Sequence, residues 1–263
     1  MYDYIRAGIA CVMLLAPATV WAAHPLEVED TATEGKGNYL LEVAGDSTRD
    51  NSRKSTTLTT ILTAGAGENV DFSMEVPYRE LDPGPVTGEF ARGAGDVRIK
   101  MKQQLFENEV KQSMAYLIYM DVPTGEAERD VDHGLGTSNV LWGVKLVDSQ
   151  GCCSNAFHAH LGYEMLGRDL KKRHFAGDYA VNFGLAAEHR LSDSFRILAE
   201  FSGENRKETN RAADISTYSQ PLTFLAGAIY DISKSWQVNV GARVGLNKYA
   251  EDHDFLAATA WKF

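Results

Sequence analysis

The sequence has no apolar run of transmembrane-helix length, and it has little positive charge. Its longest apolar stretch, Ala7 to Val20, is shorter than the roughly 20 residues that a membrane-spanning helix needs. The chain of 263 residues has a net charge of −10 and no basic stripe, which argues against nucleic acid as a partner. It also lacks a phosphate-binding glycine loop and any zinc-ligand spacing. We therefore predict no cofactor and no metal.

Cysteine is scarce as well, with three residues in the chain. Cys11 lies in the apolar N-terminal stretch, and Cys152 and Cys153 are adjacent in a polar segment predicted to be a turn. Adjacent cysteines rarely form an unstrained disulfide. The simplest interpretation is two surface thiols in a turn, with a strained disulfide between neighbours as the alternative.

The N-terminus has the organisation of a secretory signal peptide. Arg6 precedes the apolar stretch, and Val20-Trp21-Ala22 offers small residues at a cleavage position. We therefore predict that residues 1–22 are removed on export. An N-terminal membrane anchor is the alternative, but His24-Pro25 ends the apolar run.

The C-terminus alternates with a period of two, which predicts a β-strand. Phe255, Ala257, Thr259, Trp261 and Phe263 fall on one face of this strand. A terminal aromatic residue with apolar residues at every second position before it resembles the assembly signal of outer-membrane β-barrels. An edge strand of a soluble sandwich is the competing interpretation.

The same alternation recurs along the chain. Between Val70 and Arg79, for example, Phe72 and Met74 alternate with Ser73 and Glu75. We count about twelve such segments, and an even number is typical of single-chain outer-membrane barrels. Short turns alternate with longer loops, as periplasmic turns alternate with extracellular loops in these barrels. A barrel also explains the low mean hydropathy of −0.27, because half of each strand faces a polar lumen.

The fold class predicted from these patterns is all-β, a transmembrane antiparallel up-and-down barrel of about twelve strands. We expect a signal peptide at residues 1–22, a periplasmic arm at 23–37 and the barrel at 38–263. The barrel would lie in the outer membrane of a Gram-negative bacterium, in contact with lipid and lipopolysaccharide. Phe263 would be read by the barrel-assembly machinery.

Several short motifs resemble those of a known family. They are His24-Pro25-Leu26, Glu29-Asp30-Thr31, Thr33 to Asn38, Val76-Pro77-Tyr78, Gly93 to Val97, Val122 to Gly125 and Gly134 to Thr137. The family is that of bacterial outer-membrane transporters associated with the MetA pathway of phenol degradation. Glu29 stands where the family pattern has Asp. The resemblance implies a small outer-membrane barrel that passes aromatic or other hydrophobic compounds.

The inward-facing polar residues are the candidate site. The predicted pore-lining set is Glu75, Arg98, Lys100, Asp121, Lys145, His158, His160, Glu164, Glu188, Arg196, Glu200 and Arg243. In a pore these charges would set selectivity; alternatively, acids and bases pair across the lumen and fill it. His158, His160 and Glu164 share one strand face, but such neighbours lie about 7 Å apart, which suits a single metal ion poorly.

The predicted function is a channel or porin for passive uptake of small molecules, with hydrophobic or aromatic compounds as the implied class, and not an enzyme. Two alternatives stay open. One is a non-conducting structural barrel, and the other is an outer-membrane lipid-modifying enzyme, which would need a nucleophile, a base and an orienting group within reach of one another.

Overall fold

The computed structural model describes residues 26–51, 53–82, 90–125, 135–136, 139–169, 178–210 and 215–263. Every regular element in these ranges is a β-strand. The strands are β1 (Tyr39–Asp50), β2 (Arg53–Gly67), β3 (Val70–Asp82), β4 (Ala91–Ala94), β5 (Val97–Glu107), β6 (Gln112–Val122), β7 (Asn139–Cys152), β8 (Asn155–Asp169), β9 (Tyr179–Ser192), β10 (Phe195–Asn210), β11 (Ile215–Ser219), β12 (Leu222–Ser233), β13 (Trp236–Gly245) and β14 (His253–Lys262).

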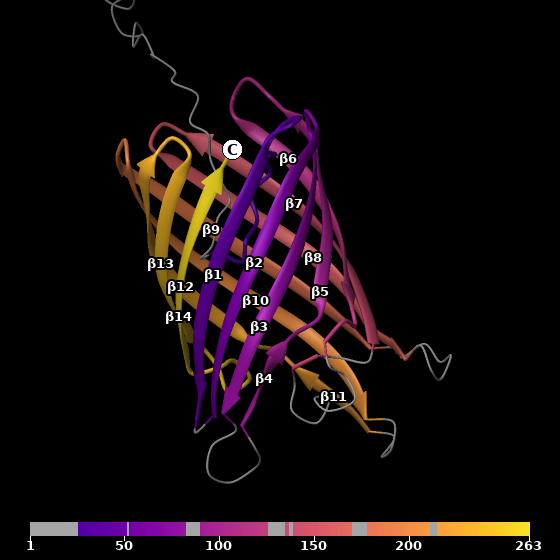
Figure 1. The fold of residues 1–263 in the computed structure, drawn as a ribbon. Helices are drawn as coiled ribbons and strands as arrows, with labels where there is room; N and C mark the ends of the chain where they lie inside the picture. The colour runs from indigo at the N-terminus through magenta and orange to yellow at the C-terminus, as the bar shows by residue number, and fades with distance from the viewer. Residues whose placement is uncertain are drawn as a thin grey trace, which may run out of the picture.

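Twelve of these strands form a closed antiparallel barrel (Figure 1). Each barrel strand pairs with its neighbours in sequence, and β14 closes the ring against β1 from Leu40–Lys262 to Arg49–His253. The two remaining strands are additions at one end: β4 pairs with β3, and β11 pairs with β10. Closure gives a backbone partner to each strand edge, which a barrel needs where no water is available.

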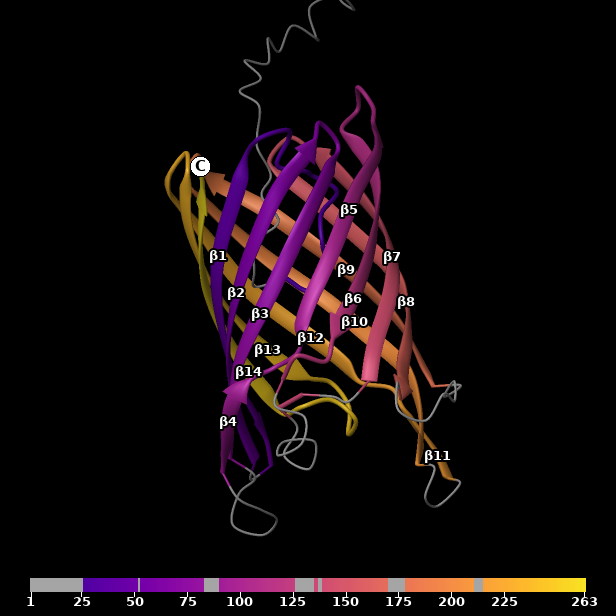
Figure 2. The ribbon, with the colours of Figure 1, turned by 45° about the vertical axis from the view of Figure 1, so that its right-hand side comes forward.

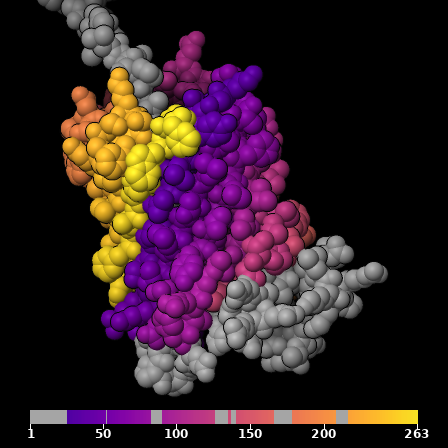
Figure 3. Space-filling model, in the orientation of Figure 1, coloured from indigo at the N-terminus to yellow at the C-terminus, as the bar shows by residue number. Residues whose placement is uncertain are grey.

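Alternation along the strands separates an apolar exterior from a polar lumen. On β3, Phe72, Met74 and Tyr78 are exposed on the outside, whereas Asp71 and Ser73 are buried inside. The outer surface also shows the closing seam, where the yellow C-terminal strand lies against the indigo first strand (Figure 3). The protein is an outer-membrane β-barrel, since an exposed apolar exterior around a polar interior suits lipid outside and water within.

The two ends of the barrel differ in their connections. Five hairpins, including the two-residue turns at 68–69, 153–154 and 193–194, lie at the end that carries the C-terminus (Figures 1 and 2). Most connections at the opposite end are longer. Short turns are periplasmic and long loops extracellular in this class of barrel. No helix that could cross a bilayer is found in the part of the chain that the structure describes.

Several strands extend further than the sequence predicts. Their polar composition predicts a turn at Asp148 to Asn155 and a loop at Glu204 to Ser219. Instead, β7 continues to Cys152, β8 begins at Asn155, and β10 forms a hairpin with β11. Backbone pairing continues beyond the apolar belt because polar side chains are acceptable on both faces once a strand leaves the lipid.

The segment before β1 lies inside the barrel. Residues 26–37, which we call the plug, belong to the stretch predicted as a periplasmic arm. They lie in the lumen, where Leu26 packs beside Leu225 and Leu256, and they run to the start of β1 at the end where the short turns lie (Figure 1). Val28 is 2% exposed and Thr31 is 3% exposed. The sequence analysis did not anticipate this position in the lumen.

Candidate functional site

The lumen holds a cavity of about 2130 Å³ that is lined by both the barrel wall and the plug. Eleven of the twelve predicted pore-lining residues contribute to its lining; the twelfth, Glu200, also points inward but is 1% exposed and covered by the plug. The alternation of each strand therefore directs these side chains to a common interior. The space between them is shared with a segment of the same chain.

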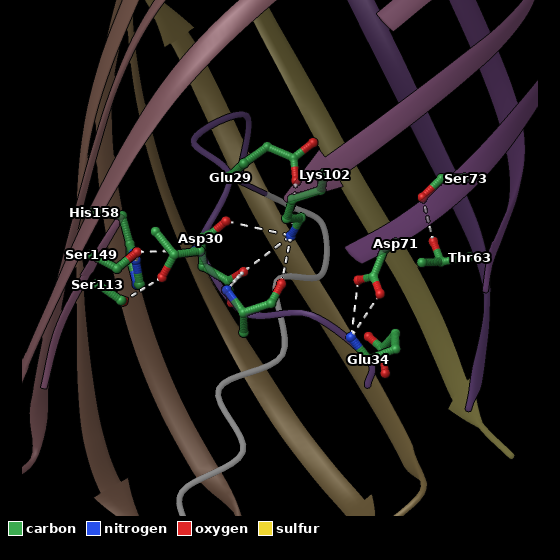
Figure 4. Close-up of polar contacts among 12 residues, drawn as sticks. Glu29, Asp30, Glu34, Thr63, Asp71, Ser73, Lys102, Ser113, Ser149 and His158 are labelled. Carbon is green, nitrogen blue, oxygen red and sulfur yellow. Dashed lines mark hydrogen bonds and ion pairs between the residues drawn. The ribbon is translucent and has the colours of Figure 1, made fainter. Parts of the chain in front are cut away.

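Acidic side chains of the plug meet basic side chains of the wall (Figure 4). The Glu29 carboxylate lies 2.6 Å from Nζ of Lys100 and 3.5 Å from Nζ of Lys102. Asp30 adds a contact of 3.3 Å to Lys102. Lys102 also donates to the backbone carbonyls of Asp30 and Ala32, at 3.4 and 3.0 Å. The two lysines lie two residues apart on β5 and therefore share the lumen face.

Two further ion pairs fix the ends of the plug. Glu27 lies 2.8 Å from Nη1 of Arg243, and Glu34 lies 2.8 Å from Nζ of Lys262. The backbone N–H of Glu34 also donates to the Asp71 carboxylate at 2.9 Å. Charge of opposite sign thus meets at several points between the plug and the wall. The Glu34–Lys262 pair is largely buried, whereas the Glu27 side chain is half exposed, so water screens its pair with Arg243 more strongly.

Further hydrogen bonds hold the plug, and most of their donors are its backbone N–H groups. The backbone N–H groups of Glu27 and Val28 donate to one oxygen of Glu200, at 2.8 and 3.0 Å. Further along, the N–H of Thr31 donates to Oγ of Ser149 at 3.2 Å, and its hydroxyl pairs with Ser113 at 2.5 Å. A buried wall carboxylate with two backbone donors satisfies amides that would otherwise be orphaned in the lumen.

One wall glycine makes room for the plug. Gly184 is on the lumen face of β9, and a Cβ atom at this position would lie 2.4 Å from Cγ2 of Val28. The same atom would lie 2.8 Å from the His160 ring. Val28 can therefore pack against the wall at this point only because residue 184 has no side chain.

An apolar surface lies on another part of the lumen wall, on β10, β12 and β14, and the strand order places it across the barrel from β5. Leu198, Leu225, Ile229 and Leu256 form a buried apolar cluster inside the barrel, and Leu26 of the plug packs against it. The lumen therefore offers both an apolar surface and a basic surface. The plug contacts the first through Leu26 and the second through acids that follow within a few residues.

The remaining wall charges pair with one another. Arg98 makes a two-point contact with Asp121 at 2.6 and 2.9 Å, and Arg196 contacts Glu188 at 3.2 Å. The Tyr119 hydroxyl donates to Glu164 at 2.5 Å. These pairs join neighbouring or next-neighbouring strands along the wall, so they differ from the pairing across the lumen that the sequence left open as an alternative to a charged path.

The histidines do not form a metal site with Glu164 in the described structure. Across the described ranges, no group of three or more His, Cys, Asp or Glu side chains is placed to hold a metal ion. Nδ1 of His158 instead lies 2.8 Å from Oγ of Ser149, and Glu164 binds Tyr119.

Sequence reasoning missed the residues on the plug side of the interface. Glu27, Glu29, Asp30 and Glu34 were assigned to a solvated arm, and Lys102, although expected to point inward, was left out of the candidate set. One signal was available: the arm is rich in acids, whereas β5 presents several bases to the lumen. Charge complementarity between them could have indicated the contact.

Comparison with known proteins decides the family. A family model described as "Putative MetA-pathway of phenol degradation" matches residues 30–263. The chain belongs to this family. The match covers the plug from Asp30 onward and all of the barrel, so the resemblance drawn from short motifs is confirmed.

Solved structures with the same fold are outer-membrane barrels. An outer membrane channel from Pseudomonas putida F1 superposes with a TM-score of 0.69 at 12% identity, covering 92% of this chain and 100% of that one. The NanC porin gives a TM-score of 0.57 at 10% identity, over 85% of this chain and 100% of that one. The KdgM porin gives 0.54 at 12% identity, over 85% and 99%. No curated protein matches this sequence.

Proposed function

We propose that this family member is an outer-membrane channel for passive uptake of small molecules, and that its own N-terminal segment closes it. The observation that carries the proposal is a cavity of about 2130 Å³ inside a closed barrel, lined in part by the plug, which joins β1 at the end where the short turns lie. In a barrel with a purely structural role, an apolar filling of the lumen would stabilise the fold more than buried charges do, because buried charges need partners.

Hydrophobic or aromatic compounds are the proposed class of solute. Two observations support this class: the apolar cluster around Leu225 inside the lumen, and the family's description, which refers to phenol degradation. The predicted pore-lining residues, from Glu75 to Arg243 along the chain, would supply the polar part of the path.

The test is planar-bilayer recording of the mature protein beside a variant that lacks Leu26 to Thr33. The mature protein should show small or brief openings, and the deletion should give larger, steady conductance because the ion pairs of Glu27, Glu29 and Asp30 are lost. Liposome swelling with phenol-like solutes and with sugars then measures selectivity. A deletion variant that folds as a barrel yet stays electrically silent would favour a structural barrel instead.

We further propose that the chain is not an enzyme. The arrangement closest to a catalytic triad is Ser149, His158 and Glu188. Nε2 of His158 lies 3.8 Å from Glu188, beyond hydrogen-bond distance, and the Ser149 hydroxyl already accepts from the plug. The contacts of Ser149 with the plug and with His158 therefore support a role in holding the plug in place. Ester hydrolysis by the purified protein that disappears in Ser149→Ala would contradict this proposal.

The remaining proposals concern export and assembly. Residues 1–22, which lie outside the described ranges, would be a signal peptide. Phe263 is 67% exposed at the periplasmic end, where the barrel-assembly machinery could read it. Lipopolysaccharide would contact the outer half of the apolar exterior.

A further inference from the structure

The plug presents two kinds of group to the lumen at a short separation. Leu26 packs on the apolar cluster of Leu198, Leu225, Ile229 and Leu256, and the Glu29 carboxylate bridges Lys100 and Lys102. Three residues of chain span at most about 10 Å. The plug therefore resembles a short amphiphile, with an apolar end and a carboxylate end, bound to a matching pair of surfaces.

Lys102 depends on the plug more than any other lumen base does. Within the described residues, the hydrogen-bond and ion-pair partners of its ammonium group belong to Glu29, Asp30 and Ala32. Lys100, by contrast, keeps Glu75 of the wall at 3.1 Å. Lys102 is 9% exposed. If the plug left the lumen, this ammonium would lose all of these contacts. Asp71, its cross-strand partner on β3, would remain nearby, so Lys102 would keep only part of its counter-charge in a confined site, and that is costly.

An incoming ligand can remove this cost only if it brings a negative charge. A neutral hydrophobic molecule would cover the leucine cluster but leave Lys102 uncompensated, and an amine would add repulsion. A molecule with a carboxylate and an apolar tail restores both contacts that the plug makes. Because it binds the plug-free state better than the plugged state, it also shifts the population toward opening.

We propose that the lumen holds a binding site for amphipathic monocarboxylates, and that the plug occupies this site as an internal competitor. The ligand's carboxylate takes the place of Glu29 between Lys100 and Lys102. Its apolar tail takes the place of Leu26 on the apolar cluster. The inference rests on the proposed channel function and specifies the solute class.

The test uses the mature protein in lipid nanodiscs and radiolabelled hexanoate, with binding to empty nanodiscs subtracted. Hexanoate should bind saturably, and unlabelled hexanol, hexylamine and acetate should each compete at least about tenfold less well, as expected for loss of a charge-assisted contact or of apolar burial. Equal competition by hexanol would overturn the carboxylate assignment. Equal competition by acetate would overturn the tail site.

Two variants separate a ligand site from a purely structural contact. Glu29→Gln removes the internal competitor, so hexanoate should bind more tightly. Lys102→Gln removes the cation that binds the ligand, so hexanoate binding should weaken by about tenfold. Glu29→Gln and Lys102→Gln both loosen the plug, so their opposite effects on binding separate a ligand site from a structural contact. Lys234→Gln, an equal charge change in the exposed turn between β12 and β13, away from the cavity lining, is the matched control and should bind as the unaltered protein does. Weaker binding in Glu29→Gln would refute the competitor role.

Conductance measured on the same preparations keeps this inference distinct from the channel proposal. If Glu29→Gln opens the channel while hexanoate binding stays unchanged, the channel proposal stands and the carboxylate site is wrong. If hexanoate binds as expected but neither variant conducts, the binding site stands and the channel proposal fails.

Discussion

Gly184 shows how much one residue controls in a crowded lumen. A side chain there would overlap Val28 of the plug, with 2.4 Å between the new Cβ and the valine methyl. The plug itself is held by several contacts, yet each depends on the segment lying close to the wall. A small change in wall shape can therefore act on the whole segment.

We expect Gly184→Val to raise the open probability of the channel. Overpacking of this kind costs about 1–3 kcal/mol, which corresponds to about a tenfold or greater shift toward the unplugged state. Single-channel recording measures the change. Gly45→Val is the control, because a Cβ atom at Gly45 meets nothing closer than 3.9 Å.

A second substitution checks the cause. Val28→Ala removes the methyl group that the new side chain would meet, so the double variant should return toward the closed behaviour of the unaltered protein. If Gly184→Val opens the channel equally in both backgrounds, the displaced group is the His160 ring, and the explanation through Val28 is wrong.

At the scale of elements, the seam between β1 and β14 closes the barrel. The N–H of Tyr39 donates to the carbonyl of Phe263 at 2.9 Å, and the N–H of Phe263 donates back at 3.0 Å. Their rings stack with centroids 5.8 Å apart. The last residue of the chain thus completes the seam at the periplasmic end in addition to any role in assembly.

Deletion of Phe263 should lower the stability of the folded barrel by about 2–4 kcal/mol, the sum expected for two net hydrogen bonds and one aromatic pair. The measurement is the unfolding midpoint in urea. The folded fraction at each urea concentration is read from the heat-dependent mobility of the barrel on gels. Phe263→Tyr keeps both backbone bonds and the ring, and should unfold close to the unaltered protein. An unchanged midpoint after deletion would contradict a role for the seam.

The sequence predicts the barrel strands well and their ends less well. Within the membrane, one face of each strand contacts lipid and the other faces the lumen. Apolar residues such as Phe72 and Met74 therefore alternate with polar ones, and this alternation shows which face each residue lies on. Beyond the lipid, as in the β10–β11 hairpin, neither face must be apolar and the pattern disappears. Periodicity did not reveal the plug for a related reason: its contacts with Lys100 and Lys102 join distant parts of the chain, so only the opposite charges of the two segments, and not local alternation, could have indicated them.

At the scale of the whole molecule, the position of an outward-facing residue relative to the bilayer should decide how much a charged substitution there destabilises the folded barrel. Leu161 lies near the middle of β8 and is 60% exposed, whereas Leu191 lies beside a periplasmic turn and is 56% exposed. We expect Leu161→Arg to destabilise the barrel by about 2–4 kcal/mol and Leu191→Arg by about 0–1 kcal/mol. Unfolding in phospholipid vesicles measures both, and equal losses would contradict the membrane position.

The two cysteines report the orientation of the molecule. Cys152 and Cys153 are exposed at a short turn, with Sγ atoms 3.7 Å apart. With a reductant present, a bulky impermeant maleimide should label them only after the outer membrane is permeabilised. A Tyr218→Cys variant that lacks both native cysteines is the control. Tyr218 is 58% exposed on β11 at the opposite end, so this variant should be labelled in intact cells. The reverse pattern would invert the topology.

The plug is continuous with β1, and this connection has a kinetic consequence. When the segment swings out of the lumen, Asn38 and Tyr39 still hold it at the periplasmic rim, so it cannot diffuse away. Its return is an intramolecular event at an effective concentration on the order of millimolar. If the plug closes the channel as proposed, each opening is self-limiting, and the pore closes again without a second protein after the solute has passed.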